Sequence, residues 1–218
     1  MNLAIFDLDN TLLGGDSDHA WGTFLADKGL TDSAVFRAQN DKFYADYEKG
    51  QLDIHAYQAF VMAPAVNLPA EQLKQLQEEF LISHIQPIML PKAQDLLDEH
   101  RAHGDYLLII TATNEWITRP IATLLGVDHL IATQLAEVNG KITGQIIGIP
   151  SFREGKVQRL MEWLPTTPCT LTNSYFYSDS FNDLPLLEIV THPVAVDADK
   201  KLTAIAEQRG WRIMSLRG

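Results

Sequence analysis

The sequence predicts an α/β fold: a Rossmann-like parallel sheet flanked by helices, with an all-helical segment inserted after the first strand. Three observations lead to this prediction. A short apolar run near the N-terminus ends in acidic residues, a long stretch with helical periodicity follows it, and the rest of the chain alternates between helix and strand patterns. The chain has 218 residues, 46% of them hydrophobic, which is enough for a large core.

The first predicted strand is the apolar run at residues 3–6, which leads into Asp7-Leu8-Asp9-Asn10-Thr11. A fully apolar run of this length is typical of a buried parallel strand, and ligands bind at the carboxyl ends of such strands. Asp7 and Asp9 can project to one side because side chains alternate along an extended backbone. Two close carboxylates are unfavourable unless a cation lies between them or one holds a proton. The pair therefore predicts a metal, an acid or both, although the acids could instead only cap a turn.

The stretch from Gly14 to Pro87 predicts four helices. Breaks are expected near Gly29, Gly50 and Pro64, and no β-rich run interrupts the pattern. We therefore expect residues 14–87 to form a helical cap, inserted into a catalytic core made of residues 1–13 and 88–218. The four apolar stripes are Ala20, Trp21, Phe24 and Leu25; Phe36, Phe43, Tyr44 and Tyr47; Tyr57, Phe60 and Val61; and Leu73, Leu76, Phe80 and Leu81.

The remainder of the chain alternates between helices and strands. Because a helix separates each predicted strand from the next, we expect right-handed crossover connections and a parallel sheet. Asn139-Gly140 is typical of a tight hairpin turn. The expected helices are 91–103, 116–125, 154–163, 184–190 and one ending before Gly210, and the expected strands are 106–110, 130–133, 174–177 and 194–196.

Polar side chains follow the predicted strands. The carboxyl ends of parallel strands form the edge of the sheet at which ligands bind, so we expect the functional residues there. Thr111 follows the strand at 106–110, and Asp179 and Asp183 follow the strand at 174–177. Lys156 stands in the first turn of a predicted helix, where the helix dipole disfavours a cation, so another role is expected. As alternatives, Thr111 and Asp183 could serve only as helix caps.

Lys92 and Lys141 are the other candidates for the cation near the strand ends. Lys141 falls in the predicted hairpin, and Lys92 precedes the wrong strand. Most lysines are simply solvated. Lys156 is therefore the lysine expected at the site.

The motifs in this order resemble the haloacid dehalogenase superfamily of phosphohydrolases. The resemblance covers the whole chain, because the helical insertion resembles the cap of the phosphoserine-phosphatase-like subclass. It implies that Asp7 attacks phosphorus and becomes an aspartyl-phosphate, and that Asp9 acts as general acid and then general base. Thr111 and Lys156 would bind the transferring oxygens.

The same resemblance implies a Mg²⁺ cofactor. The metal would be held by Asp7, Asp179 and the backbone carbonyl of Asp9, since Mg²⁺ prefers oxygen ligands. Asp183 would orient Lys156 or the metal's waters, and Thr11 and Asn182 would support the site. Ser178 departs from the family pattern, which often has Gly before the acid.

The substrate is expected to be a small phosphorylated metabolite selected by the cap. Phosphoserine phosphatases carry a Glu where this chain has Asp16, and they grip the substrate carboxylate with a cap Arg. Arg37 is the only Arg in the predicted cap, which weakens phosphoserine as substrate. A phosphomonoester with an amine and a ring fits better, and the chain resembles histidinol-phosphate phosphatases of this superfamily. The expected substrate contacts are Asp16, Asp18, Trp21, Phe43, Tyr47 and Glu115, although most of the aromatic residues could instead be core.

Composition excludes several other classes. A net charge of −11 argues against nucleic acids and anionic membranes as partners. Cys169 is the only cysteine, which suits a reducing cytosol, and no signal peptide or membrane span is expected, so we expect a cytoplasmic protein. Two alternatives remain: a phosphoserine phosphatase with its carboxylate clamp at Arg37 or Arg119, and a regulator phosphorylated on Asp7 without turnover. The sequence leaves the oligomeric state open.

Overall fold

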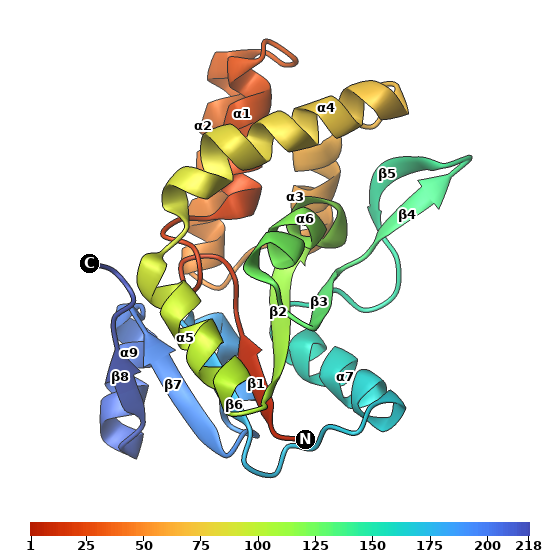
Figure 1. Cartoon of the computed structure of the whole chain (residues 1–218). Coiled ribbons are helices and arrows are strands. Elements are labelled where there is room, and N and C mark those ends of the chain that lie inside the picture. Colours follow the sequence, from red (N-terminus) through yellow and green to blue (C-terminus); the bar gives the residue numbers. More distant parts are fainter.

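The main sheet has six parallel strands in the order β3-β2-β1-β6-β7-β8, in a computed structural model that describes residues 1–218 apart from the side chain of Ser33 (Figure 1). Every neighbouring pair in this sheet runs parallel. The predicted parallel sheet is therefore confirmed. The strands are β1 (Leu3–Phe6), β2 (Tyr106–Asn114), β3 (His129–Thr133), β6 (Tyr175–Ser178), β7 (His192–Val196) and β8 (Arg212–Met214).

Strand β1 lies at the centre of the sheet and is buried on both faces. All four of its side chains are fully buried. Ala4 and Phe6 belong to the hydrophobic cluster on one face of the sheet, and Leu3 and Ile5 belong to the cluster on the other face. Burial on both faces explains why this strand is a continuous apolar run instead of an alternating one.

Helices cover both faces of the sheet. Helices α5 (Pro91–Ala102) and α6 (Glu115–Leu125) contribute to the cluster around Phe6, and helices α7 (Glu154–Trp163), α8 (Leu184–Leu187) and α9 (Lys200–Arg209) contribute to the other. Helices α6 and α9 end at Gly126 and Gly210, whose φ angles of 68° and 67° are left-handed. Glycine adopts this conformation at little cost, so it marks both helix ends.

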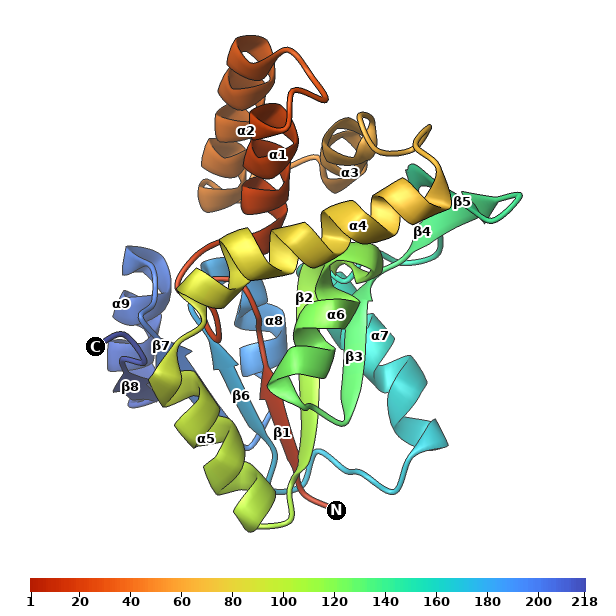
Figure 2. The same ribbon diagram turned by 45° about the horizontal axis from the view of Figure 1, so that its top comes forward.

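The four helices predicted between Gly14 and Pro87 are confirmed as α1 (Ser17–Asp27), α2 (Ser33–Glu48), α3 (Ile54–Met62) and α4 (Ala70–Phe80). The first three begin at an Asp cap, whose carboxylate accepts a backbone N–H from the first turn. Figure 2 shows these helices above the ends of strands β1 and β2. A π-helical turn (Leu81–Ile85) and a 3₁₀ turn (Gln86–Ile88) lead from α4 to α5.

The chain enters and leaves the α1–α4 segment at one place. The backbone N–H of Gly14 donates to the carbonyl of Ile88 at 2.7 Å, and Leu13 forms an isolated antiparallel bridge with Met89. The hairpin of β4 (Leu135–Val138) and β5 (Lys141–Ile146) also reaches this segment (Figure 1). A Cβ on Gly144 would lie only 3.3 Å from Cβ of Met62, so β5 packs closely against α3.

Three elements differ from the sequence predictions. Strand β2 continues to Asn114 instead of ending at Ile110, because after an irregularity it pairs again with β3 through Asn114 and Thr133. Helix α8 begins at Leu184 as predicted, after a 3₁₀ turn (Phe181–Asp183), but it ends at Leu187 instead of residue 190. The edge strand β8 was not predicted, because three residues carry too little periodicity to be recognised.

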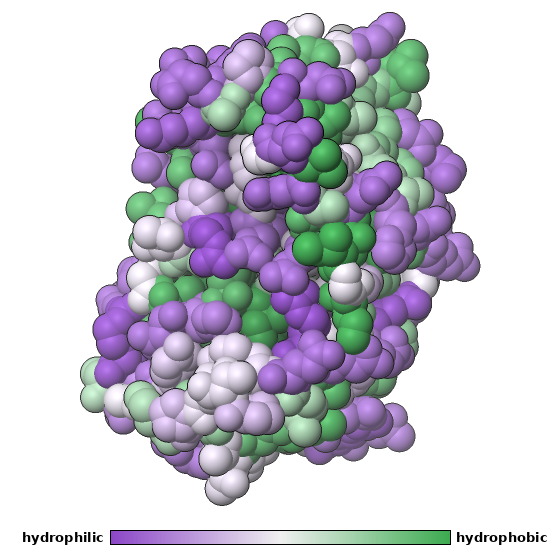
Figure 3. Space-filling view, turned by 90° about the vertical axis from the view of Figure 1, so that its right-hand side faces the viewer, coloured by the Kyte–Doolittle hydropathy of each residue, from purple (hydrophilic) through white to green (hydrophobic). Residues whose placement is uncertain are grey.

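The surface is mainly polar. On the face drawn in Figure 3, hydrophilic residues predominate and small hydrophobic areas lie between them. Throughout the described residues, we find no helix with both the length and the apolar character needed to cross a membrane.

Gly155, directly before Lys156, is expected to tolerate no side chain. A Cβ at this position would lie 2.0 Å from the carbonyl oxygen of Pro150, which is backbone and cannot rotate away. We predict that Gly155→Ala lowers the free energy of unfolding by about 3 kcal/mol, measured by urea denaturation. Gly15→Ala is the matched control, because its Cβ would make only an ordinary contact of 3.4 Å with Ile88 Cδ1. Equal losses in the two variants would contradict the prediction.

Candidate active site

A buried ion-pair network lies at the carboxyl end of β1. Lys156 Nζ donates to Asp7 Oδ1 at 2.8 Å and to a carboxylate oxygen of Asp183 at 2.7 Å, and its side chain is 2% exposed. Ser178 Oγ donates to Asp183 at 2.7 Å, so the residue that departs from the family pattern anchors this acid. The sequence prediction that chose Lys156 over Lys92 and Lys141 agrees with this placement.

Burial and charge shift the pKa values in this network. Burial alone would lower the pKa of Lys156, but the carboxylates of Asp183 and Asp7 outweigh it and raise the pKa above its usual value. Burial raises the pKa of Asp7 to about 7; Lys156 opposes this shift, while Asp183 and Asp9 add to it. The ammonium is therefore held charged, and it offsets only part of the surrounding negative charge.

Asp9 joins the end of β2 to the first turn of α1. Its Oδ2 accepts the hydroxyl of Thr113 at 2.8 Å, and its Oδ1 accepts the backbone N–H of Ser17 at 2.7 Å. Burial and then the charge of Asp16 raise the pKa of Asp9 to about 7, despite these hydrogen bonds. Sequence analysis missed Thr113, although its spacing of two from Thr111 was a usable signal on a strand.

Asp179, at the end of β6, is tied to the loop after β1. Thr11 Oγ1 donates to Asp179 Oδ1 at 3.1 Å and accepts the Asp179 backbone N–H at 3.1 Å. Burial raises the pKa of Asp179 well above its usual value, and the charges of Asp7 and Asp183 raise it further. The predicted neighbours Asp7, Thr11, Asp179 and Asp183 therefore share one region.

These residues fit a hard divalent cation. Asp7 and Asp183 share the single ammonium of Lys156, whereas Asp9 and Asp179 have only neutral hydrogen-bond partners. Burial raises the pKa of Asp7, Asp9 and Asp179. No group of three or more His, Cys, Asp or Glu side chains in the described chain is arranged to hold a metal. Mg²⁺ accepts a site in which two carboxylates are completed by a backbone carbonyl and water. Such a site agrees with the surplus of carboxylates and needs no cluster of three metal-binding side chains.

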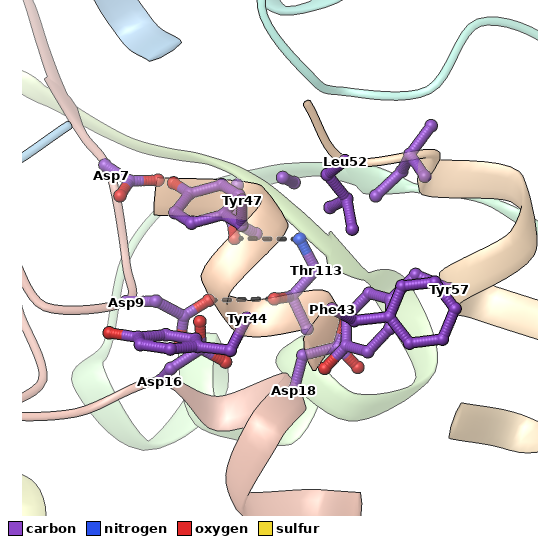
Figure 4. A pocket seen from close by; sticks show the side chains of 13 residues that line it. Asp7, Asp9, Asp16, Asp18, Phe43, Tyr44, Tyr47, Leu52, Tyr57 and Thr113 are labelled. Atoms are coloured by element: carbon purple, nitrogen blue, oxygen red, sulfur yellow. Dashed lines mark hydrogen bonds between the residues drawn. The ribbon is translucent and has the colours of Figure 1, made fainter. Parts of the chain in front are cut away.

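A pocket between the strand ends and helices α1–α3 adjoins this network. Its acidic wall comes from the β1 end and the start of α1, and its other wall is apolar and aromatic (Figure 4). The cavity between the lining side chains is small, with a volume of about 30 Å³. The lining residues are Asp7, Asp9, Asp16, Asp18, Phe43, Tyr44, Tyr47, Leu52, Ile54, Tyr57, Thr111, Ala112 and Thr113.

Two of the six expected substrate contacts do not line this pocket. Trp21 is fully buried in the hydrophobic core, where it packs on Phe24, Phe80 and Trp116, because it lies on the inward face of α1. Glu115 lies outside the pocket and pairs with Arg119 one turn along α6. The other four expected contacts line the pocket: Asp16, Asp18, Phe43 and Tyr47.

The alternative carboxylate clamps also lie elsewhere. Arg37 pairs with Asp27 on the surface, and Arg119 pairs with Glu115. Neither arginine lines the pocket. In this conformation, neither Arg37 nor Arg119 is therefore placed to hold a substrate carboxylate in the pocket.

Arg153, the residue directly before α7, connects the α1–α4 segment to the rest of the protein. This role was not predicted from the sequence. Its guanidinium donates to the carbonyl of Gly50 and, at 3.3 Å, to Asn182 Oδ1, while Asn182 Nδ2 donates to the carbonyl of Tyr47 at 3.1 Å. The backbone of Arg153 has φ 53° and ψ −123°, a conformation that costs a residue with a side chain about 1–3 kcal/mol. Such strain persists only where surrounding contacts support it.

The family follows from a comparison with known proteins. Residues 4–188 match the family model described as haloacid dehalogenase-like hydrolase. The chain belongs to this family. The resemblance inferred from the motifs is confirmed, and so is the prediction of an enzyme of the phosphoric monoester hydrolase class.

The relatives of this haloacid dehalogenase-like hydrolase include a histidinol-phosphatase of Neisseria meningitidis, 46% identical over 99% of both chains. A crystal structure of a protein of unknown function from Bordetella pertussis is 43% identical, with a TM-score of 0.91 over 99% of this chain and 98% of that one. A phosphoserine phosphatase solved as an analogue of its phospho-aspartyl intermediate has a TM-score of 0.72 over 99% of this chain and 93% of that one. At 18% identity it shows the shared fold only.

Removing the buried ammonium is expected to destabilise the protein strongly. Lys156→Met leaves Asp7 and Asp183 buried without their cation, so we predict a loss of about 3–5 kcal/mol in the free energy of unfolding. Adding Asp183→Asn should restore part of this loss, because it removes one uncompensated charge. Urea denaturation measures both effects.

The control is Lys92→Met, because Lys92 is exposed and donates only to the carbonyl of Arg217. We expect it to change stability by less than about 0.5 kcal/mol. A Lys156→Met protein as stable as this control would contradict the prediction.

Proposed function

We propose that this protein hydrolyses phosphomonoesters through an aspartyl-phosphate on Asp7. The observation that carries the proposal is the position of Asp7 between Lys156 and the pocket. Asp7 attacks phosphorus, and Asp9 protonates the departing alkoxide. Asp9 then takes a proton from the water that attacks the phosphorus of the aspartyl-phosphate. Inorganic phosphate leaves, and the carboxylate of Asp7 is restored.

The remaining residues position and neutralise the phosphoryl group. Thr111 and Lys156 bind its oxygens, with Lys156 oriented by Asp183. Mg²⁺ would be held by Asp7, Asp179 and the backbone carbonyl of Asp9, and when bound it would offset charge on the phosphoryl oxygens. The hydroxyl of Thr11 donates to Asp179 and holds it in place. The side-chain amide of Asn182 donates to the backbone carbonyl of Tyr47, a residue that lines the pocket.

We also propose that residues 14–87 act as a cap on a core of residues 1–13 and 88–218. Two contacts support this division. The connections at Gly14 and Ile88 lie side by side, as a hinge requires, and the guanidinium of Arg153 in the core donates to the carbonyl of Gly50 in the cap. A closed cap excludes water while Asp7 is phosphorylated, and an open one admits water and releases the product.

The substrate we propose is histidinol phosphate, converted in the cytoplasm during histidine biosynthesis. The relative from Neisseria meningitidis is named a histidinol-phosphatase and matches over its whole length. The lining supports a cationic, ring-bearing alcohol, since it holds four Asp side chains and six aromatic or large apolar ones. Phosphoserine is the second candidate, and it lacks a cationic partner for its carboxylate among the lining residues.

The first test addresses the nucleophile and the metal. Asp7→Asn should lower kcat by at least about 1,000-fold, since a catalytic nucleophile is lost, while far-UV circular dichroism stays that of the wild type. Chelation with EDTA should abolish phosphate release, and added Mg²⁺ should restore it. The exposed Asp95→Asn is the matched control. Full turnover by Asp7→Asn would refute the mechanism, and a phosphorylated protein that never releases phosphate would favour the regulator.

The second test addresses the substrate. We expect histidinol phosphate to have the highest kcat/KM in a panel that also contains phosphoserine, sugar phosphates and nucleotides. The physical reason is that the acidic pocket favours cationic groups and repels a carboxylate. Phosphate release in the presence of Mg²⁺ measures each value. A wide margin in favour of phosphoserine would overturn this assignment.

A further inference from the structure

Asp18 has one carboxylate oxygen that lacks a partner. Its Oδ2 accepts Gln58 Nε2 at 2.6 Å, while its Oδ1 makes no hydrogen bond to any side chain or backbone group that the structure describes. The residue is 3% exposed and lines the pocket. A buried acceptor without a donor is unfavourable, so this oxygen is suited to a donor brought by a ligand.

The orientation of Asp18 is set by a chain of buried side chains that begins in the sheet. Asn114 is the N-cap of α6, since its Oδ1 accepts the Ile117 N–H at 3.1 Å, and its Nδ2 donates to Gln58 Oε1 at 2.8 Å. Gln58 and Asn114 are both fully buried. Because the oxygen of Gln58 is already occupied, its NH₂ group must face Asp18.

The chain of Asn114, Gln58 and Asp18 crosses from the core to two helices of the proposed cap. Asn114 lies at the end of β2, Gln58 on α3 and Asp18 on α1. A carboxylate fixed in this way loses little conformational freedom when a ligand binds, so a single hydrogen bond to it can discriminate strongly.

The surroundings of Asp18 favour a flat ring over an aliphatic cation. Phe43, Leu52, Ile54 and Tyr57 form the apolar wall of the pocket, and Figure 4 shows Asp18 on the side of Phe43 and Tyr57. Burial raises the pKa of Tyr57 well above its usual value, and the charge of Asp18 adds to this shift. Burial and then the charge of Asp16 raise the pKa of Asp18 itself well above its usual value.

We propose that Asp18 Oδ1 accepts a hydrogen bond from a ring N–H of the substrate. The Asp18–Gln58 pair then selects phosphomonoesters whose alcohol carries a nitrogen heterocycle such as imidazole, with Gln58 as a positioning residue. This inference rests on the proposed phosphatase function, and it names the group that the pocket recognises.

The experiment compares two substrates that differ only in the ring. Histidinol phosphate is set against 2-amino-3-phenylpropyl phosphate, which keeps the amine and the phosphate but replaces the imidazole by phenyl. The wild type should prefer histidinol phosphate by about 10- to 100-fold in kcat/KM, the range of a hydrogen bond to a charged group. This comparison requires no variant, so it stands even if a substitution impairs folding.

Asp18→Asn should reduce the preference between the two substrates to within about threefold. Gln58→Met should act through KM more than kcat with histidinol phosphate, because the carboxylate remains but is no longer oriented. Asp95→Asn, exposed on α5, should keep the wild-type preference. Circular dichroism of each variant establishes that it is folded.

The outcomes separate this inference from the proposed function. If the wild type hydrolyses both substrates equally well, or if folded Asp18→Asn keeps the full preference for imidazole, the role of Asp18 is overturned and the phosphatase stands. If the wild type with Mg²⁺ releases phosphate from neither substrate nor from any other phosphomonoester in the panel, the proposed function fails and the inference fails with it.

Discussion

The structure depends on one buried ammonium held between two carboxylates. Lys156 reaches Asp7 across 149 residues of sequence and Asp183 across 27, so a single side chain joins α7 to the ends of β1 and β6. Removing three charges from water is costly, and the attraction between them compensates only when the geometry is good. Two hydrogen bonds of 2.8 Å and 2.7 Å, with Ser178 supporting Asp183, provide that geometry.

The same constraint leaves the site with an excess of negative charge. Four further acids lie near the network, and burial is the main reason that the pKa of each is raised. They are Asp9, Asp16, Asp18 and Asp179. Buried acids in such numbers are stable only with cations that the chain does not supply. A metal on the sheet side and a cationic substrate on the α1 side would meet this need.

The pocket is formed jointly by the sheet and the inserted helices. Asn114 reaches Gln58 on α3, Arg153 reaches Gly50 after α2, and Asp9 accepts the first N–H of α1. Each hydrogen bond joins a residue outside the inserted helical segment to a residue within it. Movement of that segment relative to the sheet would therefore break these hydrogen bonds.

The parallel sheet, the four inserted helices and the chemistry of the strand ends could all be predicted from local sequence patterns. These features follow from local periodicity and from the rule that parallel strands end at one edge, so Asp7, Lys156 and Asp179 could be predicted to meet. Only the tertiary structure decided which helical side chains face the pocket. A helix turns by 100° per residue, so a small rotation separates Asp18, which lines the pocket, from Trp21, which packs in the core. The partners of Asp18 and Arg153 come from 40 and 103 residues away, and local sequence carries no record of such contacts.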